Sequence, residues 1–224
     1  MSQIVGHFIQ RDILRNLSRA TSLNFSKLKP QGIDNGVFNY HLRALITRGL
    51  IVNNGGEYTL SSEGVKYVSS VTRTNLDLHP QPKIFCLLVI ENEKGEYVMH
   101  RRAAHQFMGQ NTFPVGALFF DETLDELVTR QLYEKIGSHV KMTHRGMASL
   151  RLGEKGYTLS HTYVHLLYGK IDSQTELQAK DSRFTPQWVN PSETSEVLLP
   201  DILDIINQIK LAKSYFFLDL YLTR

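Results

Sequence analysis

The chain has little of several residue types, and each shortage excludes a class of protein. Cys86 is its one cysteine among 224 residues, so an internal disulfide and a metal site of clustered cysteines are both excluded. No apolar run reaches the ~18 residues of a membrane helix. The first residues, MSQIVGHFIQRD, lack the basic and apolar segments of a signal peptide. We therefore expect a cytoplasmic protein with no membrane partner.

Net charge is also small, at +3 from 25 basic and 22 acidic side chains. It is unevenly distributed, because residues 1–72 hold eight basic and four acidic side chains and the remainder has one more acid than base. A basic surplus of this size permits DNA binding without establishing it, since many solvated surfaces have a similar balance.

A change of pattern divides the chain. Residues 73–82, RTNLDLHPQP, contain two prolines and little apolar periodicity, and they lie between a helical pattern and a strand-rich pattern. We expect two domains, residues 1–72 and 83–224, joined by a linker at 73–82.

Apolar spacing in the first part predicts three helices. The first covers about Gln3 to Arg19 with Phe8 in its apolar stripe, and the second lies in NFSKLKP and ends at Pro30. The third covers about Asn35 to Arg48, where apolar side chains four and three residues apart must face the core. That orientation places His41 towards the core and turns a polar face outward, made of Gly36, Asn39, Tyr40, Arg43 and Thr47.

A β-hairpin follows in GLIVNNGGEYTL, with its turn at Asn54-Gly55-Gly56, and a last helix begins near Ser62. This succession resembles the winged-helix domain of transcription regulators, and FNYHLRALITRGLI with YTLSSEGVKYV resembles the recognition helix, the wing and the following helix. The resemblance implies a mainly α-helical domain with a hairpin wing.

The resemblance to a winged helix also implies binding of double-stranded DNA. A helix of this width fits the major groove, where Arg43 reaches guanine or phosphate, Asn39 an adenine edge, and Tyr40 a phosphate or thymine methyl. The remaining expected DNA-binding residues are Lys27, Lys29 and Thr47. The alternative is a protein-docking module in which Tyr40 and Arg43 only cover the domain surface.

The second part reads as a mixed α/β domain. KIFCLLVIENEKGEYVMHRR predicts two strands joined at Asn92–Gly95, with Cys86 buried rather than reactive. TLDELVTRQLYEKIG predicts a helix that ends at Gly137 and begins with a capping box of Thr123 and Glu126. Further strands are expected at about 140–152 and 157–168, and a last helix begins at Pro200. Trp188 either packs under that helix or stacks on a base.

Nudix proteins share the pattern G-x5-E-x7-R-E-U-x-E-E-x-G-U, in which U is aliphatic. Six residues of this chain fall on it, namely Gly116, Glu122, Arg130, Leu132, Glu134 and Gly137. Residues 83 to about 212 therefore resemble a Nudix domain, which implies an α/β fold with a mixed sheet sandwiched by helices.

Two positions depart from the pattern. The carboxylates of the Nudix segment hold Mg²⁺ or Mn²⁺, and here Gln131 and Lys135 replace two of them, which leaves Glu134 as a weak metal ligand. A neutral amide and an ammonium group are poor substitutes for anionic oxygens. We expect a degenerate box with no intact catalytic site and no cofactor; Mg²⁺ or Mn²⁺ enters only if acids from elsewhere restore diphosphate hydrolysis.

Several residues are instead candidates for binding a ligand. Gln131 and Lys135 are four residues apart, so they share a helix face that offers an amide and a cation to a phosphate. Arg101 and Arg102 resemble the basic position that Nudix proteins use against substrate, although a surface role is as plausible. His161 and His165 share a strand face, about 13 Å apart, too far for one ion but suited to a pocket.

Together the two parts resemble the Nudix-related transcription regulators, although in the familiar members the DNA-binding part follows the Nudix part. We expect a homodimeric DNA-binding regulator that senses a small phosphorylated metabolite. The alternatives are an active Nudix hydrolase with a non-standard metal site and an interaction scaffold. The tail SYFFLDLYLT either forms an interface or completes the core.

Overall fold

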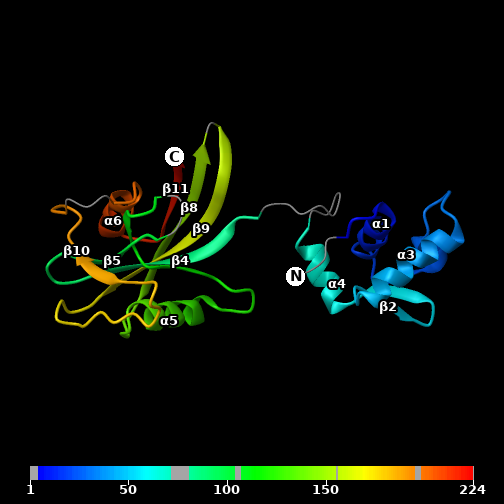
Figure 1. The fold of residues 1–224 in the computed structure, drawn as a ribbon, viewed down its shortest axis with the longest axis horizontal. Helices are drawn as coiled ribbons and strands as arrows, with labels where there is room; N and C mark the ends of the chain where they lie inside the picture. The colour runs from blue at the N-terminus through cyan, green and yellow to red at the C-terminus, as the bar shows by residue number, and fades with distance from the viewer. Residues whose placement is uncertain (1–4, 72–80, 104–106, 155, 195–197, 224) are drawn as a thin grey trace. The chain divides into compact units, whose positions relative to one another are not determined.

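The computed structural model of the protein describes residues 5–71, 81–103, 107–154, 156–194 and 198–223. It divides into two compact units, Met1–Pro80 and Gln81–Arg224 (Figure 1). Most of the expected linker, residues 73–80 of 73–82, lies outside the described residues. No helix in the described ranges is long and apolar enough to cross a membrane.

The described residues of the first unit form four helices and a small antiparallel sheet. The sheet has the strand order β1-β3-β2, and its first strand is a short segment that the sequence pattern did not predict. The elements are α1 (Phe8–Leu17), β1 (Leu23–Asn24), α2 (Phe25–Leu28), α3 (Asn35–Thr47), β2 (Ile51–Asn54), β3 (Glu57–Leu60) and α4 (Ser62–Ser69).

The start of α1 differs from the prediction. The helix begins at Phe8, because His7 is in an extended conformation and its side chain accepts a hydrogen bond from the Ile9 amide. Such an N-cap satisfies a backbone donor that lacks a helical partner. Phe8 is 54% exposed, so the expectation that it joins the buried stripe is wrong; Gln3 lies outside the described residues.

The core of the first unit is assembled from one stripe of α1 and one of α3. Ile13 and Leu14 of α1 and Phe38, Leu42 and Leu45 of α3 are each at most 1% exposed. Their burial leaves the opposite side of α3 in water, as the helical period requires.

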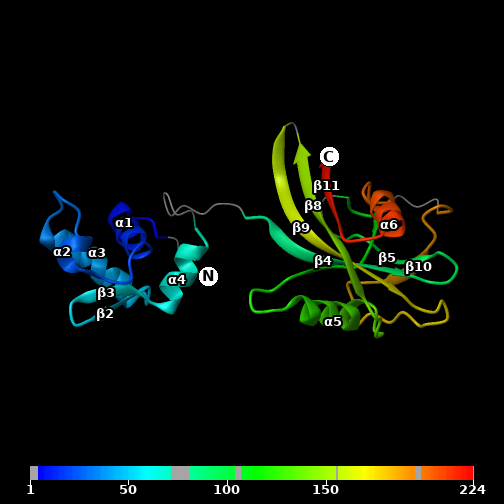
Figure 2. The ribbon, with the colours of Figure 1, turned by 180° about the vertical axis from the view of Figure 1, so that it is seen from behind.

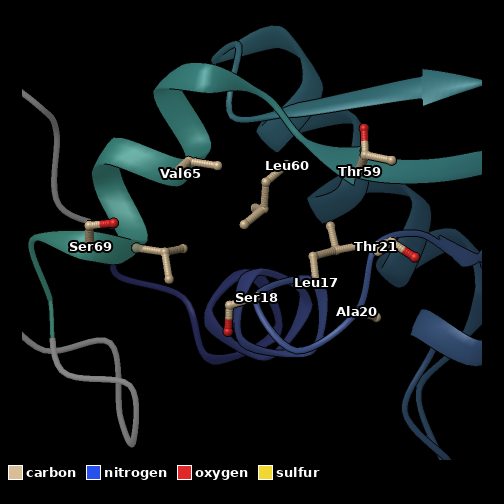
Figure 3. A pocket seen from close by; sticks show the side chains of 9 residues that line it. Leu17, Ser18, Ala20, Thr21, Thr59, Leu60, Val65 and Ser69 are labelled. Atoms are coloured by element: carbon tan, nitrogen blue, oxygen red, sulfur yellow. The ribbon is translucent and has the colours of Figure 1, made fainter.

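A cavity of about 350 Å³ lies in this unit between the end of α1, β3 and α4 (Figure 3). Aliphatic and hydroxyl side chains line it, including Leu17, Thr21, Thr59 and Val65. None of the described residues that line it carries a charge, so its chemistry suits an apolar group rather than a phosphate.

The second unit is an α/β sandwich (Figures 1 and 2). Its helices α5 and α6 cover opposite faces of one mixed sheet in both views. The elements are β4 (Lys83–Glu91), β5 (Tyr97–Arg101), β6 (Asn111–Thr112), β7 (Val115–Ala117), α5 (Leu124–Lys135), β8 (Thr143–Glu154), β9 (Tyr157–Lys170), β10 (Pro186–Val189), α6 (Ile202–Leu211) and β11 (Phe216–Thr223).

The sheet has the order β10-β5-β4-β9-β8-β11, with β6 beside β5 and β7 beside β4. The pairs β4–β9 and β8–β11 are parallel and the other pairs are antiparallel. Alternate residues of β4 serve the two cores: Cys86 and Leu88 pack with α5, whereas Leu87 and Val89 pack with α6. This alternation makes β4 the centre of the domain.

Two later segments are placed differently from the simplest expectation. Trp188 packs with the α5 core rather than under the last helix, because β10 turns its side chain to the other sheet face. The tail forms β11, an edge strand in which partly exposed and exposed side chains alternate. Its Phe216 and Leu218 pack against the α6 core, so the tail contributes to the fold.

Candidate functional site

The outer face of α3 presents the residues that the helical spacing had selected. Asn39, Arg43 and Thr47 are exposed, and Tyr40 is 70% exposed. Asp34 starts the helix by accepting hydrogen bonds from the Gly36 and Val37 amides. A planar ring, an amide and a guanidinium therefore lie on one solvent-facing stripe, which suits hydrogen bonding to base edges and phosphates.

Two lysines of the α2 region and one buried histidine are the other residues of this unit that the sequence singled out. Lys27 of α2 is exposed and Lys29, which follows the helix, is partly exposed. His41 is 8% exposed and stacks on His7 with ring centroids 3.8 Å apart. Burial, followed by the proximity of His7, lowers the pKa of His41 and so favours its neutral form; its buried position agrees with the structural role predicted for it.

In the second unit the two glycines of the box allow close packing. Gly116 of β7 lies against the side chain of Gln131, and a Cβ at this position would overlap that side chain. Gly137, directly after α5, has a φ of +74°, and a Cβ there would overlap the Gln178 carbonyl. Both glycines are therefore required by packing or backbone conformation.

Glu122 and Arg130 form a two-pronged ion pair. The Arg130 Nε and Nη2 atoms donate to the two Glu122 carboxylate oxygens at 2.7 and 2.8 Å, and Nη2 also donates to the Ala117 carbonyl at 3.0 Å. This pairing lowers the pKa of Glu122. The arginine also lies 4.1 Å from the ring centre of Phe119. Together these contacts hold the loop before α5 against the helix.

Gln131 occupies the interior. It is 2% exposed, and its Nε2 donates to Glu134 Oε2 at 3.2 Å. Its Oε1 has no hydrogen-bond partner among the described residues. The expectation that Gln131 presents its amide on an open helix face is therefore wrong, because that face of α5 packs on β7 at Gly116.

Lys135 is directed to the same sheet face. Its Nζ donates to the Val115 carbonyl and lies 5.0 Å from the ring centre of Phe184. Burial lowers the pKa of this ammonium group. The lysine thus connects the end of α5 to β7 instead of extending into solvent as a free phosphate ligand.

His100 also contacts Phe184, with ring centroids 3.8 Å apart. It is 9% exposed. Burial lowers its pKa to about 4, with the positive charges of Lys135 and Arg102 acting in the same direction. No sequence pattern points to this residue, since an isolated histidine within a strand carries no motif.

The box does not fit a divalent metal. Glu134 is its one remaining acid near the replaced positions, and its Oε2 already contacts Gln131 and, at 3.5 Å, Arg130 Nη1. Within the described ranges no group of three histidine, cysteine or acidic side chains is arranged to hold a metal ion. An amide, an ammonium and a guanidinium around one carboxylate are the wrong donor set for Mg²⁺.

A separate cavity of about 170 Å³ lies on the α6 face of the sheet. It combines aliphatic walls with aromatic, hydroxyl and charged side chains. It is lined by Phe85, Leu87, Arg102, Phe107, Thr112, Val115, Leu150, Arg151, Leu152, Ser160, Thr162, Val164, Leu199, Asp201 and Leu222.

The six predicted ligand-binding residues do not share this cavity. Arg102 lines it, whereas Arg101 is exposed and donates to the Gly109 carbonyl at 3.0 Å. Because alternate strand residues point to opposite faces, His161 and His165 face the α5 side, away from Ser160, Thr162 and Val164. This is the same sheet face that Gln131 and Lys135 contact, so the six candidates are divided between two faces.

The histidines on that face have their own partners. His161 Nε2 lies 3.1 Å from Ser149 Oγ, and His165 Nδ1 lies 3.2 Å from His144 Nε2. Burial and the neighbouring His144 lower the pKa of His165. The pairs hold β8 and β9 together across the sheet.

Two residues of the cavity belong to no sequence motif. Phe107 has a φ of +59°, an uncommon conformation for an aromatic residue and one found preferentially at binding sites. Asp201, 5% exposed, has its pKa raised by burial. Neither feature has a local sequence signal.

The sequence matches no protein-family model and no curated protein at a significant level. Solved structures with a similar fold are found, in contrast. A MutT protein of Bacillus halodurans superimposes with a TM-score of 0.52 at 14% identity, covering 63% of this chain and 90% of that chain. The Nudix domain of Shewanella oneidensis NrtR, solved with ADP-ribose, gives 0.51 at 16% identity, covering 65% and 96%. The second unit of this chain therefore has the Nudix fold.

Proposed function

We propose that this protein is a DNA-binding transcription regulator whose Nudix-fold unit binds a phosphorylated metabolite without cleaving it. The outer face of α3 is the observation that carries the proposal, with Tyr40 70% exposed beside Asn39 and Arg43. A winged helix consists of three helices, a hairpin and a further helix, and the same succession surrounds this face. In such a domain α3 enters the major groove and the lysines of the α2 region contact the backbone.

The box argues against hydrolysis. Its replaced positions hold a buried Gln131 and a Lys135 that is bonded to the Val115 carbonyl. Retention of Gly116, Glu122, Arg130 and Gly137 is explained by packing, so it carries no argument for catalysis. The proposal predicts no Mg²⁺- or Mn²⁺-dependent turnover of nucleoside or sugar diphosphates at an enzymatic rate.

The cavity on the α6 face is the proposed ligand site. Its apolar walls and its hydroxyl groups suit a ring or sugar, and Arg102 supplies the positive charge that a phosphate requires. A volume of about 170 Å³ holds part of a nucleotide rather than all of it. Since the NrtR Nudix domain was solved with ADP-ribose, ADP-ribose is the first compound to test.

The DNA proposal is tested by selecting bound fragments from random and genomic DNA with the full-length protein at a stated salt concentration, followed by footprinting. A discrete site, two-fold symmetric if the protein binds as a dimer, is the expected result. Binding that depends on salt but enriches no sequence would contradict the regulator function.

The ligand proposal is tested by calorimetry with ADP-ribose on the wild type and on two neighbouring variants. Arg102→Ala, which removes the cavity arginine, is expected to weaken binding at least tenfold. Arg101→Ala removes the same charge outside the cavity and serves as the matched control. Equal losses in both variants would contradict the assignment of the cavity, and ligand binding that leaves operator affinity unchanged would contradict the regulatory coupling.

A further inference from the structure

The two edges of the large sheet differ in a way that has a consequence for assembly. One edge strand, β10, spans only Pro186–Val189 and begins with a proline. The other, β11, spans Phe216–Thr223 and pairs with β8 over its whole length. No strand of the described residues pairs with the outer side of β11.

Natural proteins protect edge strands by shortening them or by placing lysine, proline or a bulge on them. The short β10 with Pro186 follows this rule. The sequence of β11, FFLDLYLT, contains neither lysine nor proline, and its register with β8 is continuous. Phe217 and Tyr221 are 56% and 48% exposed, so the outer edge of β11, which no described strand covers, is flanked by apolar side chains.

We propose that β11 pairs antiparallel with β11 of a second copy of this chain, which joins the two Nudix-fold units through a continuous sheet. A two-fold axis perpendicular to the sheet leaves each side chain on its original face. Directly opposite residues of an antiparallel pair have their side chains on the same face, so the axis must pass beside one residue of the strand, which then lies opposite its own copy. The register is then defined by the residue that faces itself.

Charge selects that residue. Asp219 is the only charged residue of β11, and its carboxylate accepts a hydrogen bond from Arg151 Nη2 at 2.8 Å. An axis at Asp219 would place two carboxylates directly opposite each other, which is unfavourable. An axis at Leu220 avoids this contact and still pairs Phe217–Thr223 with the same segment of the second copy. Axes at Leu218 or Tyr221 pair shorter segments.

The Leu220 register is also complementary. It places Leu218 opposite Leu222 of the second copy and Leu220 opposite Leu220 of the second copy. On the other face, Asp219 lies opposite Tyr221 of the second copy. In each chain the Arg151 guanidinium lies 6.0 Å from the Tyr221 ring centre. Each Asp219 carboxylate would therefore lie near Arg151 of the second copy as well as Arg151 of its own chain.

The pairing stands on the strand alone and does not require DNA binding, so it is measured on the full-length protein without DNA. Sedimentation equilibrium is expected to give a dimer. Leu220→Lys places two ammonium groups opposite each other and is expected to raise the dimer dissociation constant tenfold or more. Leu203→Lys, which changes a half-exposed leucine of α6, is the matched control and should remain dimeric.

Cysteine substitution tests the register directly. Opposed residues of an antiparallel pair lie within disulfide distance, and the native Cys86 is fully buried. Oxidised Leu220→Cys should form a covalent dimer, whereas Leu218→Cys and Thr223→Cys should not. Preferred cross-linking of Asp219→Cys or Tyr221→Cys would overturn the register. A wild-type monomer at roughly 100 μM, where a micromolar complex is mostly associated, would overturn the pairing itself.

Discussion

Helices α3 and α5 carry the same kind of sequence signal, but their polar residues end in opposite environments. On α3, Tyr40 is 70% exposed, whereas on α5 Gln131 is 2% exposed. On α3 the apolar stripe alone determines which side faces the core. On α5 the buried side contains Leu127, Val128 and Leu132, and Gln131 lies four residues after Leu127 on that same side. A shared helix face therefore indicates proximity but does not indicate exposure.

Replacement of an amide by a carboxylate on each helix is expected to give the largest difference in stability between the two helices. Gln131→Glu puts a carboxylate beside Glu134 in the interior, and we expect it to lower the unfolding free energy of the second unit by about 3 kcal/mol at neutral pH. Asn39→Asp makes the equivalent change on exposed α3 and should alter stability by less than about 0.5 kcal/mol. Urea unfolding of both variants measures the difference.

The pH dependence of Gln131→Glu has a defined sign. Burial raises the pKa of the introduced carboxyl above its unfolded value, so the destabilisation should decrease as the pH falls. A loss of stability that is equal for the two variants, or unaffected by pH, would contradict the buried position of residue 131.

Protonation of the buried His100 gives a second test, through the pH dependence of stability. Its pKa is about 4 in the folded chain against an ordinary value of 6.5. The unfolded chain therefore binds a proton first as the pH falls, and stability should be lost between pH 6.5 and 4, by up to about 3 kcal/mol.

His100→Phe, which keeps a ring against Phe184, should flatten this part of the stability profile of the second unit. Part of the slope should persist, because burial also lowers the pKa of His165. An unchanged slope in His100→Phe would show that His100 is not protected from protonation.

On α3 the expected effect is on binding rather than on stability. Arg43→Ala should weaken DNA binding by about 2 kcal/mol, roughly thirtyfold, while the unfolding curve stays unchanged. Lys94→Ala, in the exposed turn before β5, removes one positive charge from the second unit as a control. Fluorescence anisotropy with the selected DNA site measures both, and equal losses would reduce the role of Arg43 to net charge.

A substitution at Gly116 tests the close contact between β7 and the Gln131 side chain. Gly116→Ala places a methyl group against the Gln131 side chain and should destabilise the second unit by about 2 kcal/mol. The double change with Gln131→Ser should recover part of the loss, because the shorter side chain makes room. Gly6→Ala is the control, since no atom lies within 4 Å of its Cβ position. Additive losses in the double variant would contradict a direct contact.

The helix caps should show the smallest effects and should be similar in the two units. Asp34 caps α3, and Thr123 caps α5 through a capping box with Glu126. Replacement of either by alanine should lower stability by about 1 kcal/mol. Calorimetry that finds one cap much more important than the other would show that its helix depends on more than the cap.

Local patterns were sufficient for much of the fold. The capping box at Thr123, the turn at Gly95 and the core stripe of α3 follow from residues close in sequence, where hydrogen bonding and helical period leave few alternatives. The start of α1 was misjudged, because apolar spacing continues through Val5 although His7 caps the helix two residues later. The ligand-binding candidates could not be separated by sheet face, since sequence motifs do not specify which face a strand residue occupies.

The sequence by itself determined the Nudix-type box, the two missing carboxylates and the polar stripe of α3, because each depends on residue identity and short-range spacing. Only the tertiary structure decided that Gln131 is internal, that Arg102 rather than His161 lines the cavity, and that the tail becomes the edge strand β11. Those outcomes depend on contacts between segments distant in the chain, such as Gly116 with Gln131 and β8 with β11, whose free energies no local pattern contains.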